Sequence, residues 1–272
     1  MKISCIIPTC DRPDFLPITI RSILKQTLKP DEILIINNGK GEVTLPDDLA
    51  EKVTVYNIIP YAGVAQARNF GACLAKGEYL AFLDDDDLWN DNYLKNVAKA
   101  IDLGAECIIS RLDQMVDKEI LPFKNAHGKV SIDYILVLNP GITGTNIVIS
   151  KDAFFKLGGY DPKLPPSEDK TLILEALRNN MKIMTLPNNQ AIIRVHNNER
   201  LTDSAKIAEG IFHFTRKYSD LMNKRQLLTN WFKIYQYRYD SGKKSAFVPF
   251  VFLYVIFRLV KIMYNFKKNK TK

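Results

Sequence analysis

The chain has 272 residues, of which 46% are hydrophobic and 25% are charged, so it can bury a full core in one large domain or two coupled ones. This composition excludes a disordered chain, a collagen and a disulfide scaffold. The formal net charge of +8 resides in the residues after 242, where basic side chains meet no acidic ones.

Strands alternate with helices over the first 110 residues. Apolar runs predict strands at 4–8, 32–36, 53–59, 79–83 and 106–110, and helical spacing predicts helices at 15–26, at 64–75 and after Asn90. Asp14 is the expected N-cap of the first helix, and Pro17 falls in its first turn, where proline is tolerated. This alternation predicts an α/β fold with a doubly wound, mostly parallel sheet, which binds ligands beyond the carboxyl ends of its strands.

The alternation weakens after Ser110, where glycine and proline punctuate the chain. The pattern predicts a strand at 146–149, a short helix from Lys151, a helix at 167–179, extended runs at 182–186 and 191–195, and two helices within 203–240. We therefore divide the chain into a ligand-binding half at 1–110, a smaller and less regular lobe at 111–200, and a helical extension at 201–272.

Four aspartates, Asp84 to Asp87, follow the strand at 79–83. Two carboxylates ~4 Å apart repel by about 4 kcal/mol at an effective dielectric constant near 20, and a divalent cation removes this cost. In an extended segment Asp84 and Asp86 point the same way, which suits a shared Mg²⁺ or Mn²⁺, while Asp85 and Asp87 face elsewhere. The alternative is a solvated acidic turn that caps the next helix.

A second acidic pair, Glu168 and Asp169, opens the helix predicted at 167–179. Carboxylates at this position stabilise a helix by capping and through its dipole. The functional alternative is a general base that accepts a proton from an attacking hydroxyl. The pair by itself does not decide between them.

Several segments together carry a family resemblance. They are 3–12, 22–27, 31–36, Gly63, 67–71, 76–87, 158–161, Glu168-Asp169 and 194–196. In this order and spacing they resemble the family 2 glycosyltransferases with the GT-A fold, over roughly residues 1–200. The resemblance implies an enzyme that transfers a sugar, with inversion, from a nucleotide-diphosphate donor to a glycan or lipid-linked acceptor, using Mn²⁺ or Mg²⁺.

The resemblance also implies roles for individual residues. Asp169 would be the catalytic base, Asp86 a metal ligand, and His196 a residue that completes the metal site. The donor-binding residues would be Pro8, Thr9, Asp11, Arg12, Asn38, Arg68, Asp84 and Asp85. Glu168, Gly144 and Thr145 would lie on the acceptor side, within 111–200, although Gly144 and Thr145 are also consistent with a simple turn. Arg68 is either a phosphate ligand or a surface charge.

The match departs from the family at two positions near the expected nucleobase. An acidic residue is common at the position of Asn37 or Asn38, and an aromatic residue at that of Cys10. Asparagine donates as well as accepts hydrogen bonds, and cysteine does not stack on a base. These departures leave the nucleobase open. UDP stays our first choice of nucleotide, with GDP and dTDP as alternatives.

The cysteines show no CxxC spacing and lie in or beside apolar runs, which indicates buried thiols in a reducing compartment. The apolar run at 3–7 ends at Pro8 and is too short for a signal-peptide core. We therefore expect a cytoplasmic enzyme.

The segment at 246–266 is apolar but is interrupted by Arg258, Lys261 and Asn265, which makes it marginal as a membrane span. As a helix it would place these polar residues on one stripe with Tyr254, as in a helix that lies in a membrane interface. The basic residues of 243–272 would then meet anionic head groups at the inner face of the cell membrane. The alternative is a helix docked on the protein. Nucleic acid is not expected as a partner, because charges balance over 1–242.

Two other functions compete with sugar transfer. A nucleotidyltransferase would also use metal-bound aspartates, but it would carry a glycine-rich phosphate loop after its first strand, and 8–13 contains no glycine. A non-catalytic membrane adaptor that binds nucleotide sugars would not need Asp169. A dinucleotide-binding dehydrogenase is not expected, because no GxGxxG follows the first strand.

Overall fold

The computed structural model describes residues 1–123, 130–195 and 203–256. By its contacts the chain divides into two compact units. Unit 1 comprises Met1–Val130, Asn139–Pro162 and Glu168–Asn197, and unit 2 comprises Ser131–Leu138, Lys163–Ser167 and Asn198–Lys272. These units reflect packing alone, so the division by function into 1–110, 111–200 and 201–272 stays a prediction.

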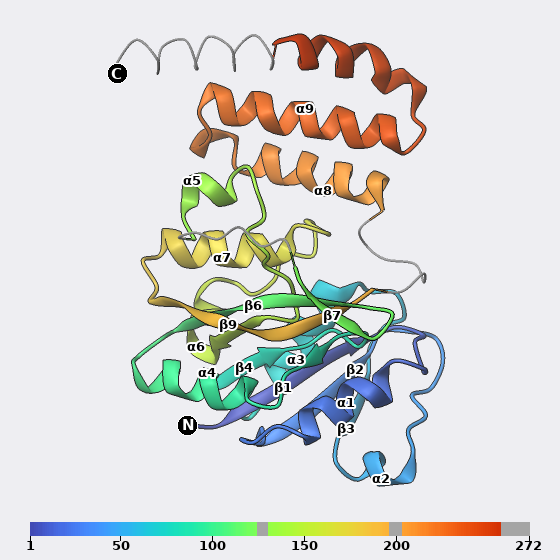
Figure 1. The fold of residues 1–272 in the computed structure, drawn as a ribbon, viewed down its shortest axis with the longest axis vertical. Coiled ribbons are helices and arrows are strands. Elements are labelled where there is room, and N and C mark those ends of the chain that lie inside the picture. The colour runs from blue at the N-terminus through green and yellow to red at the C-terminus, as the bar shows by residue number, and fades with distance from the viewer. Residues whose placement is uncertain (124–129, 196–202, 257–272) are drawn as a thin grey trace. The chain divides into compact units, whose positions relative to one another are not determined.

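The strands of unit 1 form one sheet in the order β3-β2-β1-β4-β8-β6-β9-β5, with β7 paired to β6 (Figure 1). The strands are β1 (Ile3–Thr9), β2 (Glu32–Asn37), β3 (Thr54–Asn57), β4 (Tyr79–Phe82), β5 (Leu88–Trp89), β6 (Cys107–Val116), β7 (Glu119–Pro122), β8 (Ile147–Ser150) and β9 (Ile183–Arg194). β1 to β4 pair in parallel, as do β6 and β9, whereas β8 runs antiparallel to β4 and β6. The α/β fold is confirmed, and the sheet is mixed beyond β4.

The central strand β1 is buried on both faces of the sheet. Successive side chains of a strand point to opposite faces, which places Ile3, Cys5 and Ile7 in the core on one side. On the other side, a Cβ added to Gly71 would lie 2.5 Å from Ile6 Cγ2. Glycine therefore lets one helix pack directly against the sheet, because any larger side chain would overlap β1.

The helices of unit 1 are α1 (Leu16–Leu24), α2 (Asp47–Ala50), α3 (Val64–Leu74), α4 (Tyr93–Asp102), α6 (Lys151–Lys156) and α7 (Glu168–Arg178). α3 carries Gly71, whereas α1 and α4 supply side chains to the core on the opposite face. The prediction of Asp14 as the N-cap of α1 is wrong. A turn between Arg12 and Phe15 precedes the helix, and Phe15 takes the cap position without a side-chain hydrogen bond.

Unit 2 is helical among its described residues. Its elements are α5 (Ile132–Ile135), α8 (Ser204–Lys217), the 3-10 turn Ser219–Leu221, α9 (Lys224–Asp240) and the 3-10 turn Lys244–Ala246, and α8 and α9 pack side by side (Figure 1). A capping box between Asn223 and Gln226 begins α9. The buried Asn230 amide donates to the Leu136 carbonyl at 2.9 Å, and Lys233 donates to the Val137 carbonyl at 2.6 Å. These bonds join the α5 segment to α9.

Candidate functional site

The four aspartates form a turn at the end of β4. The Asp87 backbone N–H donates to the Asp84 carbonyl at 3.1 Å, so the segment is not extended. The expected alternation, with Asp84 and Asp86 on one side, is therefore wrong. Arg12 Nη1 donates instead to Asp85 at 3.0 Å and to Asp86 at 2.6 Å. Asp84 turns toward Arg68.

Asp85 is held in a buried network at the carboxyl end of β1. The Thr9 hydroxyl donates to its carboxylate at 2.7 Å, opposite the bond from Arg12. Burial raises the pKa of Asp85 to about 6, against the lowering effects of the Arg12 charge and the Thr9 hydrogen bond. Thr9 and Arg12, which were predicted as donor-binding residues together with Asp85, thus both contact the Asp85 carboxylate.

The fourth aspartate supports the turn from inside the protein. The Asp87 carboxylate accepts hydrogen bonds from the Thr145 hydroxyl and, at 3.1 Å, from the Arg194 backbone N–H. The Arg194 guanidinium donates to the Asp86 carbonyl and, at 2.8 Å, to the Thr19 hydroxyl. Thr145 is completely buried, so its side chain braces this turn.

Arg68, on α3, connects the aspartate turn to the acidic pair of α7. Its guanidinium donates to Asp84 at 2.5 Å and to Asp169 at 3.0 Å, and lies 3.5 Å from Glu168. The side chain is 2% exposed, which excludes the alternative of a surface charge. The Tyr160 ring lies 5.1 Å from the guanidinium carbon, within the range of a cation–π interaction.

The charges around Arg68 do not balance, because three carboxylates share one guanidinium. Burial raises the pKa of both Glu168 and Asp169, and the Arg68 charge opposes this change. Arg68 Nε, Tyr160 Oη and Glu168 Oε2 are buried without a hydrogen-bond partner. Buried polar atoms normally have hydrogen-bond partners, and a ligand that binds here would provide them.

Gly144 is the closest neighbour of Arg68 among the glycines. A Cβ at this position would lie 1.8 Å from Arg68 Nη2 and 2.3 Å from Cζ. The Gly144 backbone N–H also donates to Asp169. The residue at position 144 of the predicted turn therefore has to be glycine, because a side chain there would overlap the buried Arg68.

We expect Gly144→Ala to lower the free energy of unfolding by about 1–3 kcal/mol, because the new methyl group overlaps the buried Arg68. Denaturant unfolding measures this change. Gly41→Ala is the matched control, since its Cβ would meet Asp11 Oδ1 at 3.6 Å, an ordinary contact. Equal stability of the two variants would show that Arg68 has room to move.

A cavity of about 270 Å³ opens beside the arginine–aspartate network. It is lined by Thr9, Asp11, Arg12, Pro13, Leu16, Asn37, Gly41, Glu42, Val43 and Thr44. Asp11 fixes the loop beside the cavity. Its carboxylate accepts hydrogen bonds from the Lys40 and Gly41 backbone N–H groups, each at 3.1 Å. The cavity thus lies at the carboxyl ends of β1 and β2, where such sheets bind ligands.

Two of the predicted donor-binding residues, Asn38 and Pro8, contact other parts of the sheet and its loops. Asn38 Oδ1 accepts from the Gly63 backbone N–H at 3.2 Å, which fixes the entry to α3. Pro8 is buried within β1, opposite Ile36 of β2. Both residues shape the end of the sheet that carries the cavity.

The described residues contain no cluster of three or more His, Cys, Asp or Glu side chains arranged around a metal position. The proposed ligand His196 lies outside the described residues. The Asp86 carboxylate is a hard oxygen donor that suits Mg²⁺ or Mn²⁺, and Mg²⁺ commonly binds one or two carboxylates together with substrate phosphates. Asp86, which is ion-paired with Arg12 at 2.6 Å, is therefore the described residue of the turn whose chemistry would suit such a metal.

Sequence reasoning assigned no role to Tyr160 or Thr19. Tyr160 covers Arg68, and its backbone N–H and carbonyl are both bonded to the Asn69 amide, at 2.9 and 2.8 Å. The pair Gly158-Gly159, both with positive φ, precedes Tyr160. This glycine pair is the sequence feature that could have drawn attention to Tyr160. Thr19 donates to the Asp85 and Asp87 carbonyls at 2.7 and 2.9 Å, and nothing in the local sequence indicates this.

Residues 4–156 match the family model described as glycosyl transferase family 2. The chain belongs to this family. It is 27% identical over 252 residues to the putative colanic acid biosynthesis glycosyl transferase WcaA of Escherichia coli, covering 87% of this chain and 88% of that protein. It is also 28% identical over 187 residues to an uncharacterized glycosyltransferase of Haemophilus influenzae. This match covers 65% of this chain and 62% of that protein.

The fold is also found among solved structures. The crystal structure of Staphylococcus aureus TarS residues 1–349 in complex with UDP-GlcNAc superposes with a TM-score of 0.63 at 16% identity, covering 87% of this chain and 81% of that one. The GT-A fold and the membership of the family 2 glycosyltransferases are thereby confirmed. This chain spans about 62% of the length of the Haemophilus influenzae relative.

Proposed function

We propose that this glycosyltransferase moves a sugar, with inversion, from a UDP-sugar to a glycan or lipid-linked acceptor, with Mg²⁺ or Mn²⁺ as cofactor. The observation that carries the proposal is Arg68, which links Asp84 of the aspartate turn to Asp169 of α7. One buried cation thus connects the residues proposed for the donor with the residue proposed as base. The UDP-GlcNAc in the TarS crystal supports a uridine donor.

The donor nucleotide would occupy the 270 Å³ cavity, with Thr9, Arg12 and Asp85 at its inner end. Departure of a nucleoside diphosphate accumulates negative charge on the phosphates. Arg12 and Arg68 hold positive charge next to the aspartate turn, where they stabilise this charge as it develops. Neither arginine has to be recruited from solvent, so little reorganisation accompanies the reaction.

Asp86 would hold the metal together with the diphosphate, and His196 is a further candidate ligand. When bound, the metal neutralises charge on the leaving diphosphate. Arg12, which donates to Asp86 at 2.6 Å, fixes the orientation of this carboxylate. Arg194 fixes the adjacent backbone by donating to the Asp86 carbonyl.

Asp169 would act as the base that takes the proton from the acceptor hydroxyl. Its bonds from Arg68 and from the Gly144 N–H fix the position of the carboxylate. Burial raises the pKa of Asp169 above that of an ordinary aspartate, which makes it a stronger proton acceptor. Glu168 and Gly144 would border the acceptor at this point, and Thr145 would support them from the buried side.

A screen of nucleotide-sugar donors for metal-dependent release of nucleoside diphosphate tests the proposal. We expect a UDP-sugar to be hydrolysed slowly without acceptor, and release to cease when EDTA removes the metal. Release from GDP- or dTDP-sugars alone would overturn the uridine assignment, and release unaffected by EDTA would overturn the metal.

The part of the C-terminal segment that the structure describes exposes apolar side chains. Phe247, Val248 and Phe252 are 49%, 73% and 64% exposed. No helix among the described residues is long and apolar enough to cross a membrane. We propose that 243–272 lies on the anionic inner face of the cell membrane, where exposed aromatic side chains insert and lysines meet head groups. Arg258, Lys261 and Asn265 lie outside the described residues.

Removing residues 243–272 should release the protein from anionic vesicles, because the shortened chain lacks both the exposed apolar side chains and the basic excess. Co-sedimentation with phosphatidylglycerol vesicles measures this, with phosphatidylcholine vesicles as the uncharged control. UDP binding, followed by titration, should stay unchanged. Equal sedimentation of the shortened and full chains would favour a helix docked on the protein.

A further inference from the structure

The guanidinium of Arg68 is enclosed by two residues that carry no charge. Gly144 lies against one edge, where a Cβ would come within 1.8 Å of Nη2. The Tyr160 ring covers the guanidinium, with its centroid 5.1 Å from Cζ, and Tyr160 is 1% exposed. The face of an aromatic ring attracts a cation, and it does so more strongly where water is excluded. Tyr160 is therefore a partner of the Arg68 charge in addition to the three carboxylates.

The Tyr160 ring is fixed by its own neighbours. It makes edge-to-face contacts with Phe82, at a centroid distance of 5.2 Å, and with Phe154, at 5.6 Å. Phe82 is the last residue of β4, which leads into the aspartate turn, and Phe154 belongs to α6. Close packing of this kind leaves the ring little freedom to turn or to withdraw from Arg68.

The backbone of Tyr160 is held by Asn69, the residue that follows Arg68 on α3. The Asn69 amide accepts from the Tyr160 N–H at 2.9 Å and donates to the Tyr160 carbonyl at 2.8 Å. The amide can approach because residue 159 is glycine, where a Cβ would lie 2.7 Å from Asn69 Oδ1 and where φ is +72°. Two neighbouring residues of α3 thus hold Tyr160, one through its backbone and the other through its ring.

The position of Arg68 affects the proton affinity of Asp169. Among the described residues, the charged and titratable groups that act on Asp169 are Arg68 of α3, Glu168 of its own helix, Asp84 after β4, and Tyr160. Burial raises the pKa of Asp169, the Arg68 charge opposes this change, and the two other carboxylates add to it. A guanidinium that moved away from Asp169 would therefore leave this carboxylate with a still higher pKa.

We propose that Tyr160, held by Asn69, is a positioning residue that keeps the Arg68 guanidinium between Asp84 and Asp169. This inference rests on the proposed role of Asp169 as the base and adds a residue that acts on it through Arg68. The ring, and not the hydroxyl, performs the task, because Tyr160 Oη is buried without a hydrogen-bond partner. Phenylalanine should therefore replace tyrosine here, whereas an aliphatic side chain should not.

The rate of sugar transfer as a function of pH tests the proposal in Tyr160→Leu and Tyr160→Phe. Without the ring, Arg68 is held less firmly at Asp169, so the base should become protonated at higher pH. On the acid side of the profile, Tyr160→Leu should lower the rate about five- to 30-fold, and Tyr160→Phe should keep the wild-type profile. A rate that falls equally at every pH would indicate a purely structural role and overturn the proposal. A shift in Tyr160→Phe as large as that in Tyr160→Leu would also overturn it.

The Asp169 carboxyl can also be followed without donor or acceptor. Its resonance in the NMR spectrum of protein with isotope-labelled aspartate carboxyls is identified by its loss in Asp169→Asn. We expect its pKa to be higher in Tyr160→Leu than in the wild type, and unchanged in Tyr160→Phe. An equal pKa in all three proteins would overturn the inference and leave the proposed function standing. This pattern of pKa values in a wild type without sugar transfer would overturn the proposed function alone.

Asn69→Ala provides a second variant in which the ring is retained. It removes both hydrogen bonds to the Tyr160 backbone, so it should move the pH profile in the same direction as Tyr160→Leu. A wild-type profile in both Asn69→Ala and Tyr160→Leu would overturn the proposal.

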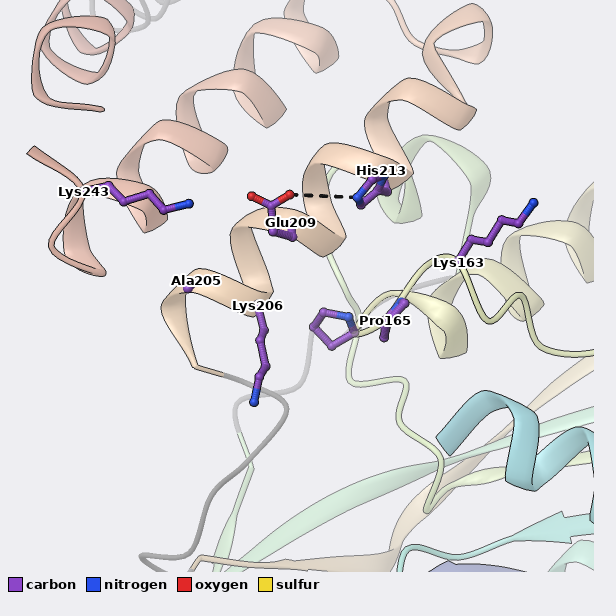
Figure 2. A pocket seen from close by; sticks show the side chains of 8 residues that line it. Lys163, Pro165, Ala205, Lys206, Glu209, His213 and Lys243 are labelled. Atoms are coloured by element: carbon purple, nitrogen blue, oxygen red, sulfur yellow. Dashed lines mark ion pairs between the residues drawn. The ribbon is translucent and has the colours of Figure 1, made fainter. Parts of the chain in front are cut away.

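Tyr235→Leu is the matched control, because it removes a tyrosine ring from another arginine–carboxylate pair. The Tyr235 ring lies 5.8 Å from Arg238 Cζ, and Arg238 donates to Glu209 at 3.2 Å. Glu209 lines a hollow of unit 2 (Figure 2) and takes no part in the proposed reaction. This variant should keep the wild-type pH profile and the wild-type pKa of Asp169. A shift equal to that of Tyr160→Leu would overturn the proposal.

Discussion

Replacing Asp169 with asparagine should abolish sugar transfer and leave UDP binding intact. Asparagine keeps the size of the side chain and its amide oxygen still accepts the hydrogen bond from Arg68, but the amide no longer takes up a proton. General-base catalysis contributes about 10²–10⁴-fold to rate, so a loss of this size is expected. Steady-state transfer assays and titration with UDP measure the two quantities separately.

Glu168→Gln is the matched control, because Glu168 also opens α7 and lies 3.5 Å from Arg68. It should lose much less of the transfer rate than Asp169→Asn, because it removes no proposed base. Burial raises the pKa of Asp169, so the wild-type rate should fall with decreasing pH already above the range of an ordinary aspartate, as the base becomes protonated. Unchanged transfer by Asp169→Asn would reduce Asp169 to a helix cap that anchors Arg68.

Asp86→Ala should remove metal-dependent turnover of the donor. The substitution deletes a hard oxygen ligand next to the proposed diphosphate, and a loss of at least about 100-fold is expected from removing one group that stabilises the leaving charge. Release of nucleoside diphosphate during a manganese titration measures the effect. The fold should persist, because Asp85 still binds Arg12 at 3.0 Å.

Asp48→Ala is the control for Asp86→Ala, since Asp48 is likewise paired with an arginine, Arg21, at 2.6 Å, but on the surface. Its turnover and metal requirement should match the wild type. Asp86→Asn refines the test, because the amide still accepts from Arg12 yet is a poorer metal ligand. A variant of Asp86 with normal manganese dependence would show that the residue only orients Arg12.

Much of the fold was predictable where the periodicity of the sequence is strong. The strands at 32–36 and 79–83 and the helix at 64–75 agree with β2, β4 and α3 to within a residue or so. The short elements β5, β7 and α2 were not predicted, because two to four residues carry no recognisable period. The runs at 182–186 and 191–195 form the single strand β9, whose pairing with β6 is interrupted by register shifts.

By itself the sequence determined the alternation of strands and helices, the acidic residues after β4 and at the start of α7, and the segments that mark the family. The tertiary structure alone decided which groups meet. Arg68 and Asp169 are 101 residues apart, and they come together because α3 and α7 are brought to one end of the same unit. The pairing of Arg12 with both Asp85 and Asp86 depends on a turn that strand periodicity does not contain. Local pattern fixes the direction of a side chain only within its own element, whereas charge pairs between elements depend on how the whole chain packs.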